Sequence, residues 1–592
     1  MTNYETLYPG TTYLLDPNYH FTGYRIPPGT IGGTTSIQTA NQLKEINNLL
    51  NQGMKVTEVS VIDDKVLEMI PKEQFKEINR LNKLTGAEST LHAPTLDPAG
   101  FTQEGWSEEN QRAVQRQFEN FVERGHDLNP DGNIPVTIHA SVIPGSEIMP
   151  AIKELLTPEE KEAGIKEVYA RIIAVDQESG RFQNLEREKK YYPGQEGIVR
   201  TPEQELQLIN ESHWDQQLAQ LLFYKERADE LAAKFYPIIN NADPKYFTPE
   251  QKTAAQQVDN AMAYYKNASM SLNALYHNAY KFSDEKTRTL LKKAAEDYKK
   301  GFSEYRHDPH NPGALSHALQ TLMQSMQVIT DANAAEAGGW KIPEKYKQVE
   351  DFAREKTSDT LSNVALKTYE KFGDKSPIIS IENPPYGQAM SSGKELKKLI
   401  ETTRNKFEKK LMQEHGLSQK EAENAAERLI GATWDTSHIS MIRKQGFGPE
   451  KITKETKEIA PFVKHVHFND NFGTTHTDLP PGMGSVPFKD VLEVLEKGKA
   501  KGKKIFEGGQ FFQHFQTSPF PYVLESSAGQ FFEGSPYFGQ VYGLQAPYYS
   551  ERGAVNPSIH HSLYGSRFQT LPLELGGETG GGQSRFAGTP NA

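Results

Sequence analysis

The chain has 592 residues, a net charge of −11 and no cysteine. It is longer than one ordinary domain, and without cysteine it cannot form disulfides or thiolate metal sites, so any transition-metal site must use His, Asp and Glu. The acidic balance gives no long-range attraction to nucleic acid, and no run of about 18 apolar residues predicts a membrane span. The N-terminal residues lack a basic-then-apolar signal pattern, so a cytoplasmic location is the expectation.

Strand-like apolar runs alternate with amphipathic helical segments in the first part of the chain. The strand-like runs lie at 31–37, 55–62, 88–94 and 134–141. The segment 71–86 begins with Pro and ends with Gly, which is typical of a helix. Four strands with helices between them predict parallel pairing.

A long stretch, 146–374, has a different pattern. Its apolar residues recur every three or four positions over several long segments, which predicts amphipathic helices. We therefore expect an all-helical insertion, built as a bundle or as antiparallel hairpins. It would act either as a lid or substrate wall, or as a decorative or oligomerising addition.

Four more strand-like runs follow, at 377–385, 429–439, 463–470 and 503–509. Eight strands alternating with helices predict an α/β fold, the closed (β/α)8 TIM barrel, formed by residues 1–145 and 375–528. The insertion then lies between strands 4 and 5. The last segment, 529–592, is low in complexity and rich in Gly, Ser, Pro, Tyr and Phe, which predicts a disordered or loosely packed tail. A protein partner could contact this tail or the helical insertion.

Imidazoles and carboxylates gather at the C-terminal ends of the predicted strands 3 to 8. A closed barrel brings these ends around one axis, so the side chains should converge on a small volume. Crowded carboxylates repel one another unless a cation neutralises them, and so many donors favour two or three divalent metals over one. The set comprises His92, His139, Glu382, Asp435, His438, His467, His476, Asp478 and Glu507. We expect nearby His465 to be structural, and Asp470 to support a metal ligand or cap a loop rather than to bind metal itself.

These residues lie in motifs that resemble those of the xylose isomerase-like TIM barrels, most closely the endonuclease IV branch (AP endonuclease family 2). The motifs "LHAP", "IHAS", "IENPPYGQ", "WDTSH", "HFND", "HTDLPPGMG" and "FEGG" occur in the family's order. The resemblance implies a DNA-repair hydrolase that cleaves abasic-site DNA with a metal-activated hydroxide. It also implies up to three Zn²⁺ ions held by the nine residues above. Glu382 would bridge two metals and help to position the attacking group, and Glu382 and Glu507 are the predicted catalytic residues.

Some features resemble other members of the same superfamily. Endonuclease IV typically has Asp-x-His where this chain has His476-Thr-Asp478, and the "LPPG" turn is closer to the sugar isomerases and epimerases. Those enzymes imply one Mn²⁺, Mg²⁺ or Co²⁺ ion and a sugar or sugar phosphate substrate, with two glutamates that shuttle a proton. The single metal would be held by Glu382, Asp435, His467 and Glu507. A non-catalytic barrel scaffold is the third alternative, and resemblance in fold does not decide between them.

Overall fold

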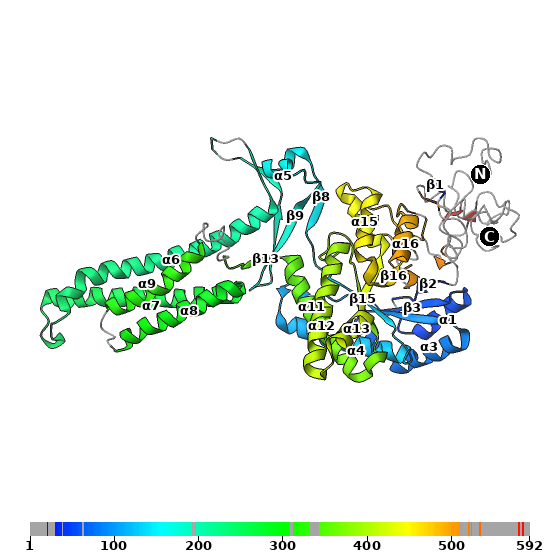
Figure 1. Cartoon of the computed structure of the whole chain (residues 1–592), viewed down its shortest axis with the longest axis horizontal. Coiled ribbons are helices and arrows are strands. Elements are labelled where there is room, and N and C mark those ends of the chain that lie inside the picture. Colours follow the sequence, from blue (N-terminus) through cyan, green and yellow to red (C-terminus); the bar gives the residue numbers. More distant parts are fainter. Residues whose placement is uncertain are drawn as a thin grey trace. The chain divides into compact units, whose positions relative to one another are not determined.

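The computed structural model describes residues 30–508, apart from gaps at 38, 62–63, 192, 195–196, 308–311, 331–341, 483, 499 and 501, and a few residues beyond each end (Figure 1). The chain divides into two compact units, which we call the barrel unit and the insertion unit. The insertion unit comprises Lys153–Gly164 and Arg171–Gln348, and the barrel unit comprises the remainder. The predicted tail lies outside the described residues, except for two-residue strands such as β18 (Phe532–Glu533), which pairs with β1 (His20–Phe21).

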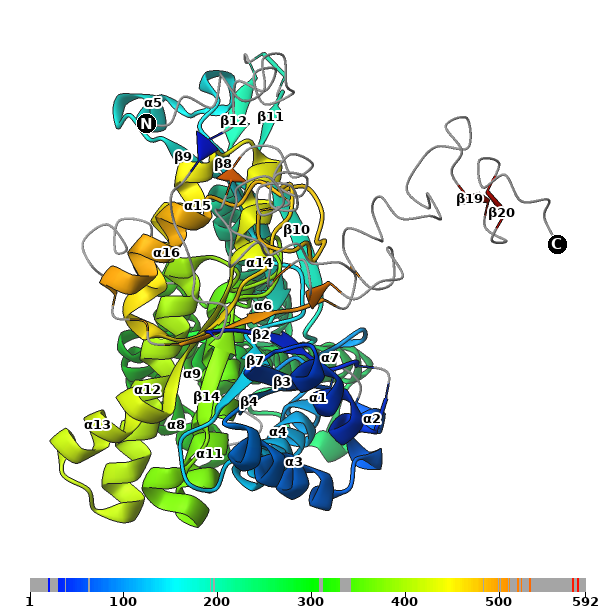
Figure 2. The ribbon, with the colours of Figure 1, turned by 90° about the vertical axis from the view of Figure 1, so that its right-hand side faces the viewer.

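The barrel unit contains the predicted closed barrel. All eight predicted strands form, and they pair in parallel in the order β14-β15-β16-β17-β2-β3-β4-β7, with β7 bonded back to β14. Figure 2 labels β2, β3, β4, β7 and β14 of this barrel. The strands are β2 (Ile31–Thr34), β3 (Val56–Ser60), β4 (Glu88–His92), β7 (Pro135–His139), β14 (Ile378–Glu382), β15 (Ile430–Asp435), β16 (Val463–His467) and β17 (Lys503–Phe506). The (β/α)8 prediction is therefore confirmed.

Alternation along the strands separates an apolar outer face from a polar interior. In β14, Ile379 and Ile381 are buried on one face, whereas Ser380 and Glu382 are buried on the other. Contacts between strands that are not neighbours identify the second face as the barrel interior. For example, Thr433 Oγ1 of β15 lies 3.0 Å from Thr137 Oγ1 of β7, two strands away. The period-2 pattern thus directs polar side chains inward at the strand ends.

Helices connect the strands and carry the expected end signals. In α3, Gly86 follows the last residue in a left-handed conformation with φ 66°, which a residue with a Cβ adopts at a cost. In α12, the side chain of Ser392 caps the N-terminus. The longer helices of the barrel unit are α1 (Gln42–Asn51), α3 (Lys72–Thr85), α4 (Glu108–Leu128), α11 (Val349–Phe372), α12 (Gly393–His415), α13 (Gln419–Leu429), α15 (Pro449–Ile459) and α16 (Phe488–Lys497).

Helix α11 belongs to the barrel unit, although the sequence analysis placed it in the insertion. It packs against α4 and α12. Gln111 of α4 donates to the carbonyl oxygen of Lys356 at 3.0 Å, and Lys406 of α12 donates to Asp359 at 2.6 Å. Its sequence has the same helical spacing as the insertion helices, so periodicity alone did not show which unit it joins.

The insertion unit is rich in helices, as expected. Its long helices run side by side (Figure 1) and share one apolar core that includes Trp214, Tyr265 and Leu272. Each of the first two begins with Thr-Pro and a glutamine that completes a capping box. The four helices are α6 (Pro202–Ile239), α7 (Pro249–Phe282), α8 (Glu285–His307) and α9 (Pro312–Thr330).

The insertion is not all-helical, so that part of the prediction is corrected. Strand β9 (Glu167–Asp176) pairs antiparallel with β10 (Phe182–Glu186) and β13 (Tyr346–Gln348). A separate hairpin joins β11 (Glu188–Lys190) to β12 (Ile198–Arg200). Most residues of β10 and β11 are exposed, and they lack the apolar alternation by which a half-buried strand is recognised.

Among the described residues, none of the helices combines the length and the apolar character that crossing a bilayer requires.

Candidate metal centre

Five barrel strands end on a side chain that can bind a metal. The last residues of β4, β7, β14, β15 and β16 are His92, His139, Glu382, Asp435 and His467. Because parallel strands bring their carboxyl ends to one face of a barrel, these side chains converge there. The other predicted donors come from the segments after β15, β16 and β17, and they are His438, His476, Asp478 and Glu507.

Glu382 lies at the middle of this set and is fully buried. Its Oε1 atom is 2.6 Å from His467 Nδ1, whereas its Oε2 atom is 3.2 Å from His92 Nε2 and 3.0 Å from His139 Nε2. Burial alone would raise the pKa of Glu382, but the charges of His467 and His139 lower it well below its usual value. One carboxylate thus faces two separate groups of imidazoles.

The first donor group combines Glu382 with Asp435, His467 and Glu507. Their ligand atoms lie within 4.8 Å of one another. His467 Nδ1 is 3.5 Å from Glu507 Oε1 and 3.9 Å from Asp435 Oδ2. Burial and the nearby charge of Glu382 raise the pKa of Glu507 to about 8 and also raise the pKa of Asp435. The three carboxylates of this group lie as close together as carboxylates that share a bound cation.

The second donor group is formed by His92, His139 and Glu382, whose ligand atoms also lie within 4.8 Å of one another. The Nδ1 atom of His92 lies 2.8 Å from the carbonyl oxygen of Ala93. A carbonyl oxygen can only accept, so Nδ1 carries a proton, and Nε2 is the nitrogen that faces Glu382 and is available for a metal. This arrangement is typical of a histidine that binds a metal through Nε2.

The third donor group comes from the loop after β16 and from α14 (Thr436–Ser440). His476 Nε2 is 3.0 Å from His438 Nε2 and 3.1 Å from Asp478 Oδ1. Burial and the charge of His476 lower the pKa of His438 to about 3, whereas Asp478 outweighs burial and raises the pKa of His476 to about 9. His438 Nδ1 donates to the carbonyl oxygen of Asn383 at 2.7 Å, which leaves its Nε2 lone pair facing the loop.

Asp470 fixes the loop that carries the third group, as expected of a loop-capping residue. Its Oδ2 atom accepts from the amides of Gly482 and Gly484 at 2.9 and 2.7 Å, and its Oδ1 atom accepts from those of Asn471 and Val486. A Cβ on Gly484 would lie 2.2 Å from Asp470 Oδ1, so this close approach requires glycine. Both oxygens of the carboxylate are thus occupied by backbone amides of the loop.

The donor set fits divalent metals. Among the described residues, the ion-pair partners of Glu382, Asp435 and Glu507 are all histidines, so no Lys or Arg there offsets these carboxylates, of which two are fully buried and Glu507 is partly buried. Asp478 Oδ1 is buried and has no hydrogen-bond partner. Imidazole and carboxylate donors without thiolates suit Zn²⁺, Mn²⁺, Mg²⁺ and Co²⁺, and they do not distinguish between these ions.

Two neighbouring residues have contacts that sequence reasoning missed. Glu58, inside β3, and His465, inside β16, are fully buried, and they form a further compact group with His467. The only signal was a carboxylate within the β-branched run 55–62. Its partners lie on the far side of the barrel, and no spacing along the chain shows them.

Part of the barrel is similar to a known protein family. Residues 389–510 match the family model described as xylose isomerase-like TIM barrel. No curated protein matches the chain.

Two solved structures are similar to the chain at low sequence identity. One is a D-tagatose 3-epimerase-like protein, with a TM-score of 0.35 and 11% identity, covering 84% of this chain and 100% of that one. The other is D-psicose 3-epimerase with D-tagatose from Clostridium cellulolyticum H10, with a TM-score of 0.35 and 7% identity, covering 81% and 84%. Both are too distant to bear on activity. The closed ring of eight parallel strands is a TIM barrel, and residues 389–510 of the chain are similar to the xylose isomerase-like members of this fold.

Proposed function

We propose that this protein is a metal-dependent hydrolase of the endonuclease IV type, which cleaves a phosphodiester bond at an abasic site in DNA. The observation that carries this proposal is the position of Glu382. One of its oxygens faces His467, and the other faces His92 and His139. A carboxylate between two donor groups is suited to bridge two metals, and a third group lies at His438, His476 and Asp478.

Each group of side chains has a role in this proposal. Glu382, Asp435, His467 and Glu507 would hold one ion, His92, His139 and Glu382 a second, and His438, His476 and Asp478 a third. Bound divalent ions supply Lewis acidity toward phosphate oxygens and lower the pKa of a bound water. The protein supplies the fixed orientation: Ala93 and Asn383 hold two of the imidazoles through their carbonyl oxygens. Glu382, Asp435 and His467 are fully buried, which limits the access of bulk water to the middle of the centre.

The swapped order of His476 and Asp478 does not exclude the third group. His476 Nε2 lies 3.0 Å from His438 Nε2 and 3.1 Å from Asp478 Oδ1. The three residues together are not among the described groups whose ligand atoms all lie within 4.8 Å of one another, so this group is the least compact of the three. Its contacts still favour the trinuclear alternative over the case in which either residue pointed away from its neighbours.

A sugar isomerase or epimerase is the second candidate, and one observation favours it. Glu382, Asp435, His467 and Glu507 form the largest of the compact donor groups and contain two glutamates. The pKa of Glu507 is raised to about 8, so its carboxyl group holds a proton near neutral pH when no cation is present. Such a pair could move a proton between adjacent sugar carbons around a single ion.

Metal content decides first between these candidates. We expect the natively purified protein to contain about three zinc ions per chain by elemental analysis, and to cleave a duplex with one abasic site. Glu382→Gln should lower the cleavage rate by at least about a hundredfold, because a bridging oxygen is lost. The exposed Glu414→Gln serves as the matched control and should leave the rate unchanged.

Other results would contradict the hydrolase. One exchangeable metal per chain, together with exchange of sugar C–H protons for solvent deuterium, would establish the epimerase instead. A protein that binds no metal would leave the barrel as a scaffold for partners.

A further inference from the structure

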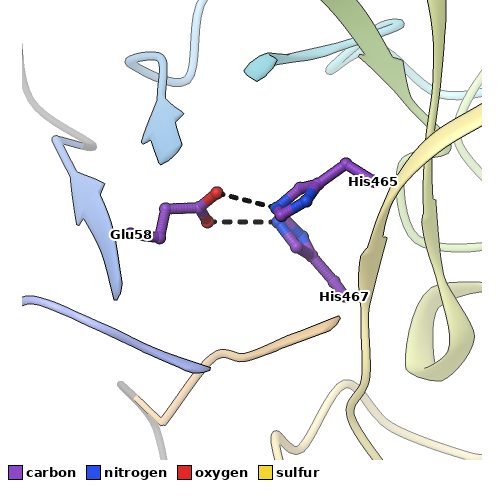
Figure 3. A group of neighbouring side chains, drawn as sticks. All are labelled: Glu58, His465 and His467. Carbon is purple, nitrogen blue, oxygen red and sulfur yellow. Dashed lines mark hydrogen bonds and ion pairs between the residues drawn. The ribbon is translucent and has the colours of Figure 1, made fainter. Parts of the chain in front are cut away.

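A carboxylate inside the barrel contacts the candidate metal ligand His467 on the side opposite the donor groups. Glu58 Oε1 lies 3.1 Å from His467 Nε2, and Glu58 Oε2 lies 3.0 Å from His465 Nε2 (Figure 3). The hydroxyl of Thr90 also donates to Oε2 at 2.7 Å. Glu58 comes from β3 and the histidines from β16, which are not neighbouring strands, so the contact crosses the barrel interior.

Glu58 and His467 have no alternative partners at the atoms that face each other. The approach of Oε1 and Nε2 is not a well-aligned hydrogen bond, and neither atom has another hydrogen-bond partner. Both residues are fully buried. Since a buried polar atom without a partner is costly, a proton on Nε2 is favoured by the 3.1 Å ion-pair contact with Glu58 Oε1.

The other nitrogen of the same ring faces the candidate metal. His467 Nδ1 lies 2.6 Å from Glu382 Oε1, within the group that includes Asp435 and Glu507. An imidazole binds a metal through a nitrogen lone pair, which requires the proton to be on the other nitrogen. A carboxylate that accepts from that second nitrogen fixes the ring and makes the ligand more basic.

We propose that Glu58 is a positioning residue for the metal centre: it holds the proton of His467 on Nε2 and so keeps Nδ1 available as a ligand. This inference rests on the proposed function only in that it concerns the same metal group. It extends the site one layer into the barrel, to a residue that touches neither metal nor substrate.

The surroundings of Glu58 explain why a carboxylate is needed. Thr90 and His465 both donate to Oε2, which fixes the orientation of the carboxyl group and leaves Oε1 for His467. In a Glu58→Gln variant the amide oxygen would take the Oε2 position, because that position has two donors. The amide nitrogen would then face His467 Nε2 and donate to it. The ring proton would move to Nδ1, where it blocks ligation.

Glu58, His465 and His467 could instead bind an ion of their own, because their ligand atoms are within 4.8 Å of one another. Two features disfavour such an ion. The first is that the group offers only three donors, all fully buried, and one of its carboxylate oxygens already accepts a hydrogen bond from the Thr90 hydroxyl. His467 would also have to serve two ions through its two nitrogens.

The test compares the wild type with Glu58→Gln by two measurements. In ¹⁵N-histidine spectra, with the His467 signal assigned by its loss in a His467→Asn variant, the wild type should carry a proton on Nε2 with and without zinc. Glu58→Gln should lose that proton. Competition with a zinc chelator should show at least about a tenfold weaker affinity for the variant. The exposed Glu88→Gln, on the neighbouring strand β4, is the matched control and should behave as the wild type in both measurements.

Several results would overturn the proposal. One is an unprotonated His467 Nε2 in the wild type, which is decisive even if the protein binds no metal or the variant fails to fold. Another is a folded Glu58→Gln protein that keeps both the proton and the affinity. A third is loss of one whole zinc equivalent with unchanged affinity for the rest, which would make Glu58 a ligand. Glu58→Asp keeps the charge, and it should retain the proton and more of the affinity than Glu58→Gln does.

Discussion

Glu395 shows how a single carboxyl group can set the pH dependence of the barrel unit. It lies in the first turn of α12, where Ser392 accepts a hydrogen bond from its amide. Burial and the nearby charges of Glu350 and Glu455 raise its pKa to about 8, despite hydrogen bonds with Ser392 that lower it. Between pH 4.5 and 8 the folded chain therefore holds a proton that the unfolded chain has released. Its contribution to stability falls as the pH rises through this range.

We expect Glu395→Gln to stabilise the protein progressively over that range, relative to its effect at pH 4.5. The gain at pH 8 should be on the order of 1–3 kcal/mol, because an amide has no proton to lose in this position. Thermal unfolding measured at several pH values checks this.

The matched control is Glu421→Gln, at the equivalent position after Ser418 in α13. Hydrogen bonds to Ser418 lower the pKa of the exposed Glu421, so this variant should gain no stability as the pH rises. Parallel curves for both variants would contradict the assignment.

At the scale of single residues, the sequence predicted the donors far better than their supports. Glu382 and His467 were identifiable because each ends a strand-like run with a polar side chain, and a closed barrel places all such ends together. Glu58 could not be found in this way. It lies in mid-strand, where a lone carboxylate is conspicuous only once His467 is known to lie opposite across the barrel.

The loop from Asp470 to Val486 acts as one element, because the Asp470 carboxylate accepts four of its backbone amides. In Asp470→Asn, the amide nitrogen would replace one oxygen and meet two N–H groups. We expect a cost of about 1–3 kcal/mol and a loosened loop. Hydrogen exchange at Gly482 and Gly484 should accelerate, and one of three bound zinc ions should be lost while the others remain.

The exposed Asp490→Asn, in the first turn of α16, controls for the loss of one negative charge. Unchanged exchange at the two glycines in Asp470→Asn would show that the loop is held by other contacts.

In the insertion unit, three helices meet at Asp229 of α6. Its carboxylate accepts from Lys225 at 2.6 Å and from Ser316 at 2.6 Å, and Tyr265 donates to it at 2.5 Å. Asp229→Ala would leave a largely buried ammonium group and two hydroxyls without this acceptor. We expect this to destabilise the bundle by about 2–4 kcal/mol. This destabilisation should appear as faster hydrogen exchange in peptides of α6 and α7. Asp297, which pairs with Lys300 on the surface, provides the control, and Asp297→Ala should have little effect.

At the scale of elements, the strands with more buried apolar residues were the ones that the sequence predicted. Strands such as β3, β14 and β15 were predicted because their residues are almost all buried and they contain Val or Ile, whereas β2 has two glycines and β17 two partly exposed lysines. Strand β9 has a similar run, with Ile172, Ile173 and Val175 buried, but it lies among helical patterns and was not separated from them. The exposed strands β10 and β11 depend on pairing with neighbours, which composition does not show.

At the scale of the whole molecule, the insertion interrupts the barrel between two strands that are hydrogen-bonded to each other. His139 at the end of β7 pairs with Glu382 at the end of β14, although residues 140–377 separate the two strands. The candidate metal centre is divided in the same way. Two of its nine donors precede the insertion and seven follow it, so the group of His92, His139 and Glu382 is complete only when both parts of the barrel are present.

This division has a consequence for synthesis of the protein. At 5–20 residues per second, a ribosome needs roughly 10–50 s to pass from β7 to β14. During that interval β2, β3, β4 and β7 exist without the strands that close them, and the open edges of β2 and β7 can pair with other chains. During the same interval the later strands that carry Glu382, His465 and His467 have not been made. The residues that contact these three therefore lack their partners, and they are Glu58, His92 and His139. The barrel therefore has a period of exposure during translation that an uninterrupted barrel of the same fold avoids.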